Sequence, residues 1–104
     1  MILLSVEEAE LEFYDALFYY ASLDPALGRR FKNDVEHCGR RVLNNPGHFR
    51  IRERGYLRIN LETFPYYLAF VVRGNTLWLL AVAPSRRKPH YWISRRKTLP
   101  PLEA

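Results

Sequence analysis

The sequence predicts an α+β fold in a single domain, residues 1–104, with a helical hairpin packed on one face of a small antiparallel β-sheet. Three observations lead to this prediction. Apolar residues recur with a helical period through the first 45 residues, the period changes to two after Gly47, and two long apolar runs flank a Gly-Asn turn. Runs of helices and strands that do not alternate favour an α+β arrangement.

The first helix is expected over residues 6–23. Ser5 and Glu8 form an S-x-x-E pattern, which is typical of a capping box at a helix N-terminus. Behind it, apolar residues recur at helical spacing: Ala9, Phe13, Ala16, Tyr20 and Leu23.

The second helix is expected to begin at Asp24-Pro25, because aspartate is a good N-cap and proline is favoured at the first helical position. Its apolar stripe is Leu27, Phe31, Val35, Cys38 and Val42, and the helix should end near residues 44–47. With almost no loop between them, the two helices should form an antiparallel hairpin. Gly28 and Gly39 each cost about 1 kcal/mol in helix propensity relative to Ala, which indicates that close packing requires them.

Strands are expected wherever the period is two. Residues 49–52 and 57–61 alternate apolar and polar side chains, and the runs 66–72 and 76–83 flank the hairpin signal Gly74-Asn75. ILLSV at the start can add another strand. The last two runs are apolar on both faces, yet the helices cover only one, so the other must be covered by the C-terminal segment, by a second copy or by a partner.

Charge is unevenly distributed along the chain. Residues 1–46 hold five Lys or Arg against eight Asp or Glu, whereas residues 47–104 hold eleven against three. Residues 83–97 alone carry six Lys or Arg beside Tyr91 and Trp92, within a basic C-terminal segment, 84–104. Such a basic half favours a polyanionic or acidic partner, and Tyr91 and Trp92 are interpreted first as residues that anchor the chain end to the sheet.

Several classes of site are not expected. The lone Cys38 cannot form an intrachain disulfide and lies on an apolar stripe, and His37, His48 and His90 lack a second ligand at metal spacing, so neither a metal nor a cofactor is predicted. No Ser-His-Asp set or phosphate-binding glycine loop is present. MILLSV is too short for a signal peptide, and no apolar run approaches the roughly 20 residues that cross a bilayer. A cytoplasmic location without membrane contact is therefore expected.

The chain resembles the ParE/RelE superfamily of type II toxin–antitoxin toxins, and within it the ParE-like branch of plasmid stabilisation proteins. The resemblance spans most of the chain, and the residues that carry it are Ala9, Leu11, Tyr20, Leu27, Gly28, Phe31, Pro46, Arg58, Phe64, Pro65, Tyr66, Arg86, Pro89, Tyr91 and Trp92. The last four are similar to the family's terminal H-x-x-R-x-P-x-Y-W signature. Pro84 stands where that signature has its His, and Lys88 stands in place of its Asp.

The resemblance implies an inhibitor of DNA gyrase rather than an enzyme. No catalytic set is then required, and the target-binding residues are expected to be Arg58, Arg86, Arg87, Lys88, Tyr91, Trp92, Arg95, Arg96 and Lys97. A cognate antitoxin is the implied partner in a hetero-oligomer. It is expected to cover the helical-hairpin groove and the open sheet face through Tyr67, Ala69, Val71, Leu77 and Leu79.

Two alternatives stay open. RelE-like members cleave mRNA on the ribosome without a metal, and the candidate catalytic residues for that chemistry are Arg52, Arg54, Arg58, Arg86 and Tyr91. Attack by the 2′-hydroxyl needs cations around the phosphate and a proton donor for the leaving oxygen. The second alternative is a basic binding module of the same fold without toxicity, which the Pro84 substitution suggests.

Overall fold

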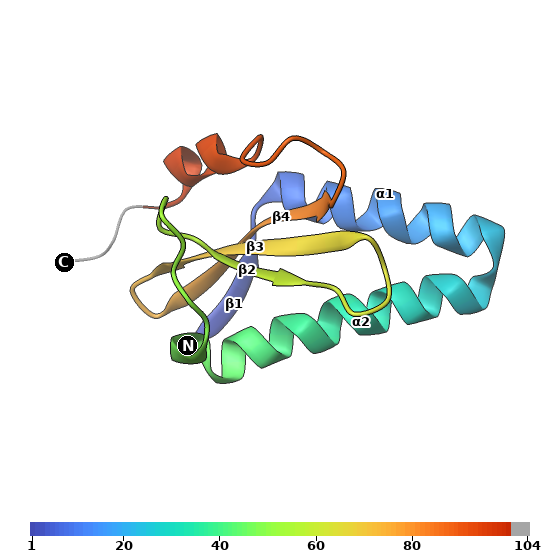
Figure 1. Cartoon of the computed structure of the whole chain (residues 1–104), viewed down its shortest axis with the longest axis horizontal. Helices are drawn as coiled ribbons and strands as arrows, with labels where there is room; N and C mark the ends of the chain where they lie inside the picture. Colours follow the sequence, from blue (N-terminus) through green and yellow to red (C-terminus); the bar gives the residue numbers. More distant parts are fainter. Residues whose placement is uncertain (101–104) are drawn as a thin grey trace.

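A four-stranded mixed sheet and a helical hairpin form the framework in a computed structural model that describes residues 1–100. The elements are β1 (Ile2–Ser5), α1 (Glu7–Leu23), α2 (Pro25–Asn44), η1 (Pro46–His48), β2 (Leu57–Asn60), β3 (Tyr66–Arg73), β4 (Thr76–Pro84) and η2 (Ile93–Thr98). The strand order is β1-β4-β3-β2 (Figure 1). The expected α+β class is confirmed. Residues 101–104 of the predicted basic segment lie outside the described residues.

The helical hairpin follows the expected boundaries. The Asp24 carboxylate accepts the Ala26 N–H at 2.9 Å, and Pro25 occupies the first turn of α2, as its sequence predicts. The start of α1 differs from the prediction. Ser5 is paired with Leu79 in the sheet, so Val6 becomes the N-cap, and it has no side-chain cap. Three glutamates in the first turn of α1 favour its positive N-terminal dipole instead.

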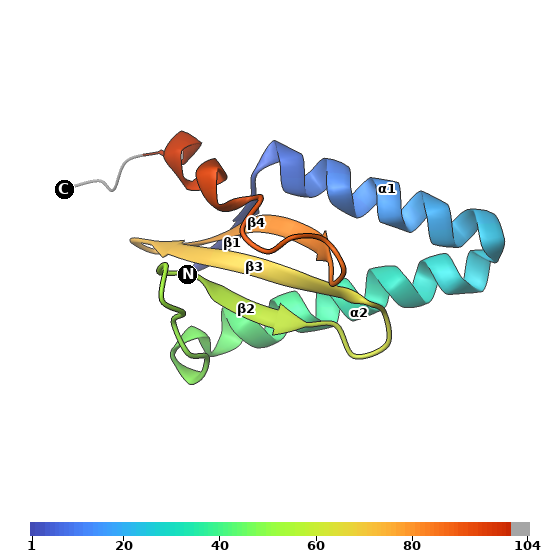
Figure 2. The same ribbon diagram turned by 45° about the horizontal axis from the view of Figure 1, so that its top comes forward.

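The tip of the hairpin projects beyond the sheet, while the other halves of both helices pack on one face of it (Figures 1 and 2). Phe31 is fully buried there, and its ring meets those of Phe13, Tyr20, Phe64 and Tyr66 at centroid distances of 5.2–5.9 Å. This aromatic cluster joins the helices to the start of β3.

Gly28 and Gly39 have different roles in the hairpin, which gives a matched test. A Cβ on Gly28 would lie 2.8 Å from the Ala21 Cβ and 3.0 Å from its Cα, so the helices would have to separate. A Cβ on Gly39 would lie 3.6 Å from Leu3 Cδ2, an ordinary contact. Gly28→Ala should therefore destabilise the fold by about 1–3 kcal/mol, whereas Gly39→Ala should be neutral or stabilising by up to about 1 kcal/mol. Urea unfolding of both variants checks this, and equal losses would contradict it.

The sheet differs from the predicted antiparallel arrangement at one edge. β3 and β4 form the expected hairpin around Gly74-Asn75, with Gly74 at φ 57°, and β2 pairs antiparallel with β3. β1, however, runs parallel to β4. The Val6 N–H bonds to the Leu79 carbonyl, so β1 ends where α1 must cross onto the helix face of the sheet.

The strand expected over residues 49–52 does not form. The Arg52 N–H bonds to the Tyr56 carbonyl at 2.8 Å, and the Gly55 N–H bonds to the Arg52 carbonyl at 2.7 Å. Gly55 has φ 78°, a left-handed conformation that glycine adopts without steric cost. Residues 52–56 are therefore a turn, and the alternating arginines of this region lie on a loop.

The second face of the sheet is covered by the chain's own C-terminal segment, one of the three coverings that the sequence leaves open. Trp92 packs on this face against Tyr67 of β3, and Leu99 is buried near Trp78 of β4. In Figure 1 the segment leading into η2 runs above the strands, on the side away from α2, and in Figure 2 it passes in front of β4. The C-terminal segment is thus a third layer of the fold.

Candidate functional site

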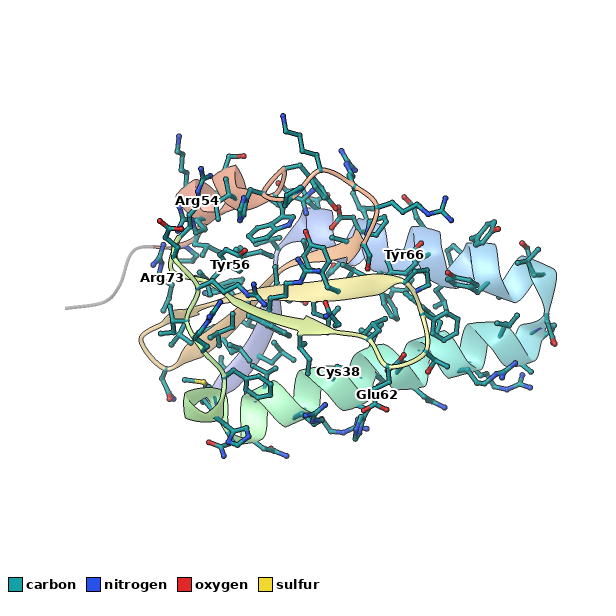
Figure 3. All side chains as sticks on the ribbon, viewed as in Figure 1. Cys38, Arg54, Tyr56, Glu62, Tyr66 and Arg73 are labelled. Atoms are coloured by element: carbon teal, nitrogen blue, oxygen red, sulfur yellow. The ribbon has the colours of Figure 1, made fainter. Side chains whose placement is uncertain are left out.

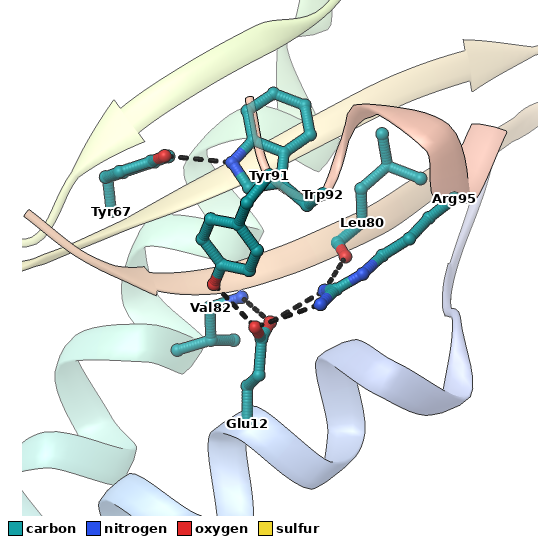
Figure 4. A network of polar contacts seen from close by, with 7 residues as sticks. All are labelled: Glu12, Tyr67, Leu80, Val82, Tyr91, Trp92 and Arg95. Carbon is teal, nitrogen blue, oxygen red and sulfur yellow. Dashed lines mark hydrogen bonds and ion pairs between the residues drawn. The ribbon is translucent and has the colours of Figure 1, made fainter. Parts of the chain in front are cut away.

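Trp92 fixes the C-terminal segment to the sheet. Its side chain is 1% exposed, and the indole N–H donates to the Tyr67 hydroxyl at 2.8 Å (Figure 4). Tyr56 packs edge-on against the indole at a centroid distance of 4.8 Å. A buried indole whose N–H has a partner contributes both apolar area and a satisfied polar group. In this structure Trp92 is an anchor and offers almost no surface to a target.

Glu12 of α1 holds the neighbouring part of the segment. Its carboxylate accepts the Tyr91 hydroxyl at 2.5 Å, the Val82 N–H at 3.1 Å and both terminal nitrogens of Arg95 at 2.9 and 3.2 Å (Figure 4). The two charged side chains are 18% and 15% exposed. A bidentate arginine–carboxylate pair of this kind is among the stronger polar contacts in proteins.

This network provides hydrogen-bond partners for backbone groups in the part of β4 that β1 does not reach. The pairing of β1 stops at Leu79, and the register of β3 and β4 shifts at the next residue, Leu80. The Leu80 carbonyl accepts Arg95 at 2.9 Å, and the Val82 N–H donates to Glu12. Backbone groups of a buried strand need such partners, so the ion pair takes the place of a missing strand neighbour.

The same contacts restrict what Tyr91 can do chemically. Burial raises the pKa of the Tyr91 hydroxyl well above its usual value, and the hydrogen bond to Glu12 raises it further. The hydroxyl proton is directed to the Glu12 carboxylate rather than to solvent. Tyr91 is therefore poorly arranged as a general acid in this conformation.

The five candidate nuclease residues do not converge on one site. Arg52 and Arg54 line a pocket together with Tyr56 and His90, whereas the Arg58 guanidinium lies 3.8 Å from the centre of the Tyr67 ring. Tyr91 is bonded to Glu12 at the edge of β4, and Arg86 is exposed in the turn after that strand.

The basic residues of the segment fall into two groups, those whose side chains bond to or stack on another residue of 1–100 and those whose side chains do neither. Arg87 stacks on the Tyr91 ring at 3.7 Å, Arg95 pairs with Glu12, and Arg96 donates to the carbonyls of Arg54 and Ile93. The others are exposed and form no hydrogen bond or ion pair with any residue of 1–100: Arg86, Lys88 and Lys97. These three are the segment's available cations.

The five residues expected to bind an antitoxin are covered by the chain itself. Their exposed fractions run from 0% to 9% for Tyr67, Ala69, Val71, Leu77 and Leu79. The expectation of an open apolar sheet face is therefore wrong, because the helices cover one face of the sheet and the C-terminal segment covers the other. An open groove of about 370 Å³ lies instead between the hairpin and the sheet, and its apolar walls include Leu3, Ala9, Phe13, Val35 and Leu79.

Cys38 is a structural thiol. It is fully buried, and its sulfur lies 3.7 Å from the Asp34 carboxylate, which also accepts the backbone N–H groups of Glu62 and Thr63. Burial, with a further contribution from Asp34, raises the pKa of Cys38 to about 11. A thiol with that pKa is not a nucleophile at neutral pH.

The sequence prediction assigns no site role to Glu12, Tyr56 or His90, although their contacts help to build these sites. Glu12 lies on a helix with four other acidic residues, and nothing in its spacing distinguishes it. Tyr56 and His90 are 34 residues apart, and their contact depends on how the C-terminal segment crosses the sheet. Among residues 1–100, no group of three His, Cys, Asp or Glu is placed to hold a metal ion, and no helix there has the length and apolar character to cross a membrane.

Comparison with known proteins identifies the fold. No family model matches the sequence, and no curated protein matches it either. Its structure is similar to a solved chain described as "Chromosomal ParDE TA system from P. aeruginosa", with a TM-score of 0.68 over 81% of this chain and 95% of that chain. The two chains share a fold. This structural similarity confirms the ParE/RelE-like resemblance for the architecture. The sequences of the two chains are 22% identical.

Proposed function

We propose that this chain is the toxin of a type II toxin–antitoxin system, that it inhibits DNA gyrase in the cytoplasm, and that a cognate antitoxin neutralises it in a hetero-oligomer. The toxin–antitoxin part is supported by the fold shared with a ParDE chain. The ParE-like resemblance of the terminal Pro89, Tyr91 and Trp92 supports gyrase as the target.

The observation that carries this proposal over RNA cleavage is the bond from the Tyr91 hydroxyl to Glu12. A metal-free ribonuclease must supply a proton to the leaving oxygen, and that donor has to face the phosphate. Here the only tyrosine of the predicted catalytic set is bonded inside the fold. Arg52 and Arg54 of that set share one pocket, whereas Arg58 stacks on the Tyr67 ring and Arg86 is exposed in the turn after β4. A gyrase inhibitor needs no proton donor, so its function is compatible with this arrangement.

Target contact is proposed for the exposed cations Arg86, Lys88 and Lys97 rather than for the whole basic segment. Arg95 and Trp92 hold the segment in place, so their effect on the target is indirect. Exposed charges at an interface mainly affect association rate and salt dependence. Loss of any one of these three charges should weaken inhibition in part without abolishing it.

The antitoxin is proposed to occupy the groove of about 370 Å³ between the hairpin and the sheet. Its walls are mostly apolar, while Glu10, Glu36 and Arg40 line it as well. Next to the groove, β1 is an edge strand with Ile2 and Leu4 exposed at 56% and 43%. An amphipathic segment could fill the groove and pair with this edge, as peptides commonly do on sheets.

Pulse labelling after induced expression tests the proposal in cells. DNA synthesis should stop first, cells should become filamentous, and protein synthesis should continue for some time. Co-expression of the product of the neighbouring gene should restore growth. The proposal fails if protein synthesis stops first and transcripts are cut on ribosomes, which would support the RelE-like alternative, or if induction has no effect, which would support a non-toxic binding module.

A further inference from the structure

A second basic surface lies outside the C-terminal segment's exposed cations. Arg50, Arg52 and Arg54 alternate along the loop before β2, and all three line one pocket of about 190 Å³. Tyr56 and His90 complete its walls, together with a single acidic residue, Glu53. Arg54 and Tyr56 lie at the same end of the molecule as Arg73 of the β3–β4 hairpin (Figure 3). The pocket therefore concentrates positive charge in a concave site.

His90 is placed in this pocket at a conformational cost. Its φ of 69° is in the left-handed region, and it is the sole non-glycine residue there among residues 1–100. Its Nε2 lies 2.9 Å from the Tyr56 hydroxyl, and Tyr56 is in turn packed against the buried Trp92. Left-handed residues other than glycine persist where the surroundings fix them, and they are frequent at ligand sites. The anchored aromatics thus hold the imidazole beside the three arginines.

We infer that this pocket binds a phosphodiester group of duplex DNA, in the form of backbone contact without base recognition. Arginines are suited to phosphate because their planar groups donate two parallel hydrogen bonds. The choice of duplex rests on the proposed gyrase function and on one observation. Binding of single strands usually relies on aromatic rings on which bases stack, but Tyr56 and Trp92 beside this pocket are 6% and 1% exposed.

The inference differs from the predicted nuclease in what it asks of these residues. In the nuclease, Arg52 and Arg54 are expected to act on RNA together with Tyr91, which lies elsewhere. Phosphate binding requires only charge and position, both of which the loop supplies. The loop would place the chain on the DNA that a gyrase complex already holds.

Binding of a fluorescent duplex oligonucleotide to the purified chain, measured by anisotropy at several salt concentrations, tests this. The test variant carries Arg50→Gln, Arg52→Gln and Arg54→Gln. The control carries Arg29→Gln, Arg30→Gln and Lys32→Gln on the exposed surface of α2, and its net charge falls by the same amount. The loop variant should lose affinity on the order of tenfold, and the slope of log K against log salt should fall by about one for each phosphate that the loop no longer neutralises. The α2 variant should change little.

His90→Gly gives a second readout, because glycine adopts a positive φ without strain. Affinity should fall severalfold while the melting temperature stays close to that of the parent chain. Equal losses in the loop and α2 variants, an unchanged salt slope in the loop variant, or tighter binding of single-stranded RNA than of the duplex would each overturn the inference. No gyrase is present in this assay, so its failure is distinct from failure of the proposed inhibition.

Discussion

Trp92→Ala should lower the free energy of unfolding by about 3–5 kcal/mol, since the indole is almost completely buried between the sheet and the C-terminal segment. The loss should include the packing against Tyr56 and the hydrogen bond to Tyr67. Denaturant unfolding monitored by circular dichroism measures it.

Two controls separate anchoring from target contact. Tyr67→Phe removes the acceptor of the indole N–H and should cost about 1–3 kcal/mol. Lys97→Ala, on an exposed side chain nearby in sequence, should leave stability within about 0.5 kcal/mol of the parent. An unchanged melting temperature for Trp92→Ala together with abolished inhibition would show that Trp92 contacts the target directly.

Glu12→Ala should be the second most damaging change, at roughly 2–4 kcal/mol. Removal of one partner of a partly buried ion pair leaves the other charge uncompensated, and the low solvent exposure of Glu12 and Arg95 limits compensation by water. The Tyr91 hydroxyl and the Val82 N–H lose their acceptor at the same time. Thermal and urea unfolding of the variant measures the loss.

Glu10→Ala is the matched control, because Glu10 lies on the same helix but is exposed. Its loss should cost only a few tenths of a kcal/mol through the helix dipole. A double-mutant cycle of Glu12→Gln with Arg95→Met should show a coupling energy above about 0.5 kcal/mol. Equal effects of Glu12→Ala and Glu10→Ala would mean that the network does not hold the segment.

These two anchors affect how functional variants are interpreted. Tyr91 and Arg95 belong to the predicted target-binding set, yet both are bonded to Glu12. A loss of toxicity in Tyr91→Phe or Arg95→Ala would therefore follow from a loosened segment as readily as from direct involvement in target binding. Variants of Arg86, Lys88 and Lys97 avoid this ambiguity, because those side chains have no partner among residues 1–100.

Local patterns in the sequence are sufficient to predict the helices and the β3–β4 hairpin. Asp24-Pro25 starts α2 and Gly74-Asn75 forms the turn between β3 and β4, and each does so through residues next to it in the sequence. The loop before β2 has the pattern of a strand because its arginines alternate with apolar residues, and the positive φ of Gly55 overrides that alternation.

Interactions between distant segments cannot be predicted in the same way. Tyr91 and Glu12 are 79 residues apart, and Arg95 meets Leu80 only because β1 is too short to cover β4. The expected antitoxin residues are inferred from strands that are apolar on both faces, a pattern that a segment of the same chain satisfies as well as a partner does. The sequence of a strand does not determine which other segment packs on the face of its sheet.

Supercoiling of relaxed plasmid by DNA gyrase, with the purified chain added at increasing concentration, tests the central claim most directly. The account predicts dose-dependent inhibition that neither Arg52→Gln nor Arg54→Gln abolishes alone. It also predicts weaker, salt-sensitive inhibition when Arg86, Lys88 and Lys97 are all changed to Glu at an unchanged melting temperature. Normal supercoiling at every concentration, together with ribosome-dependent cleavage of mRNA that Tyr91→Phe abolishes without unfolding the chain, would contradict it.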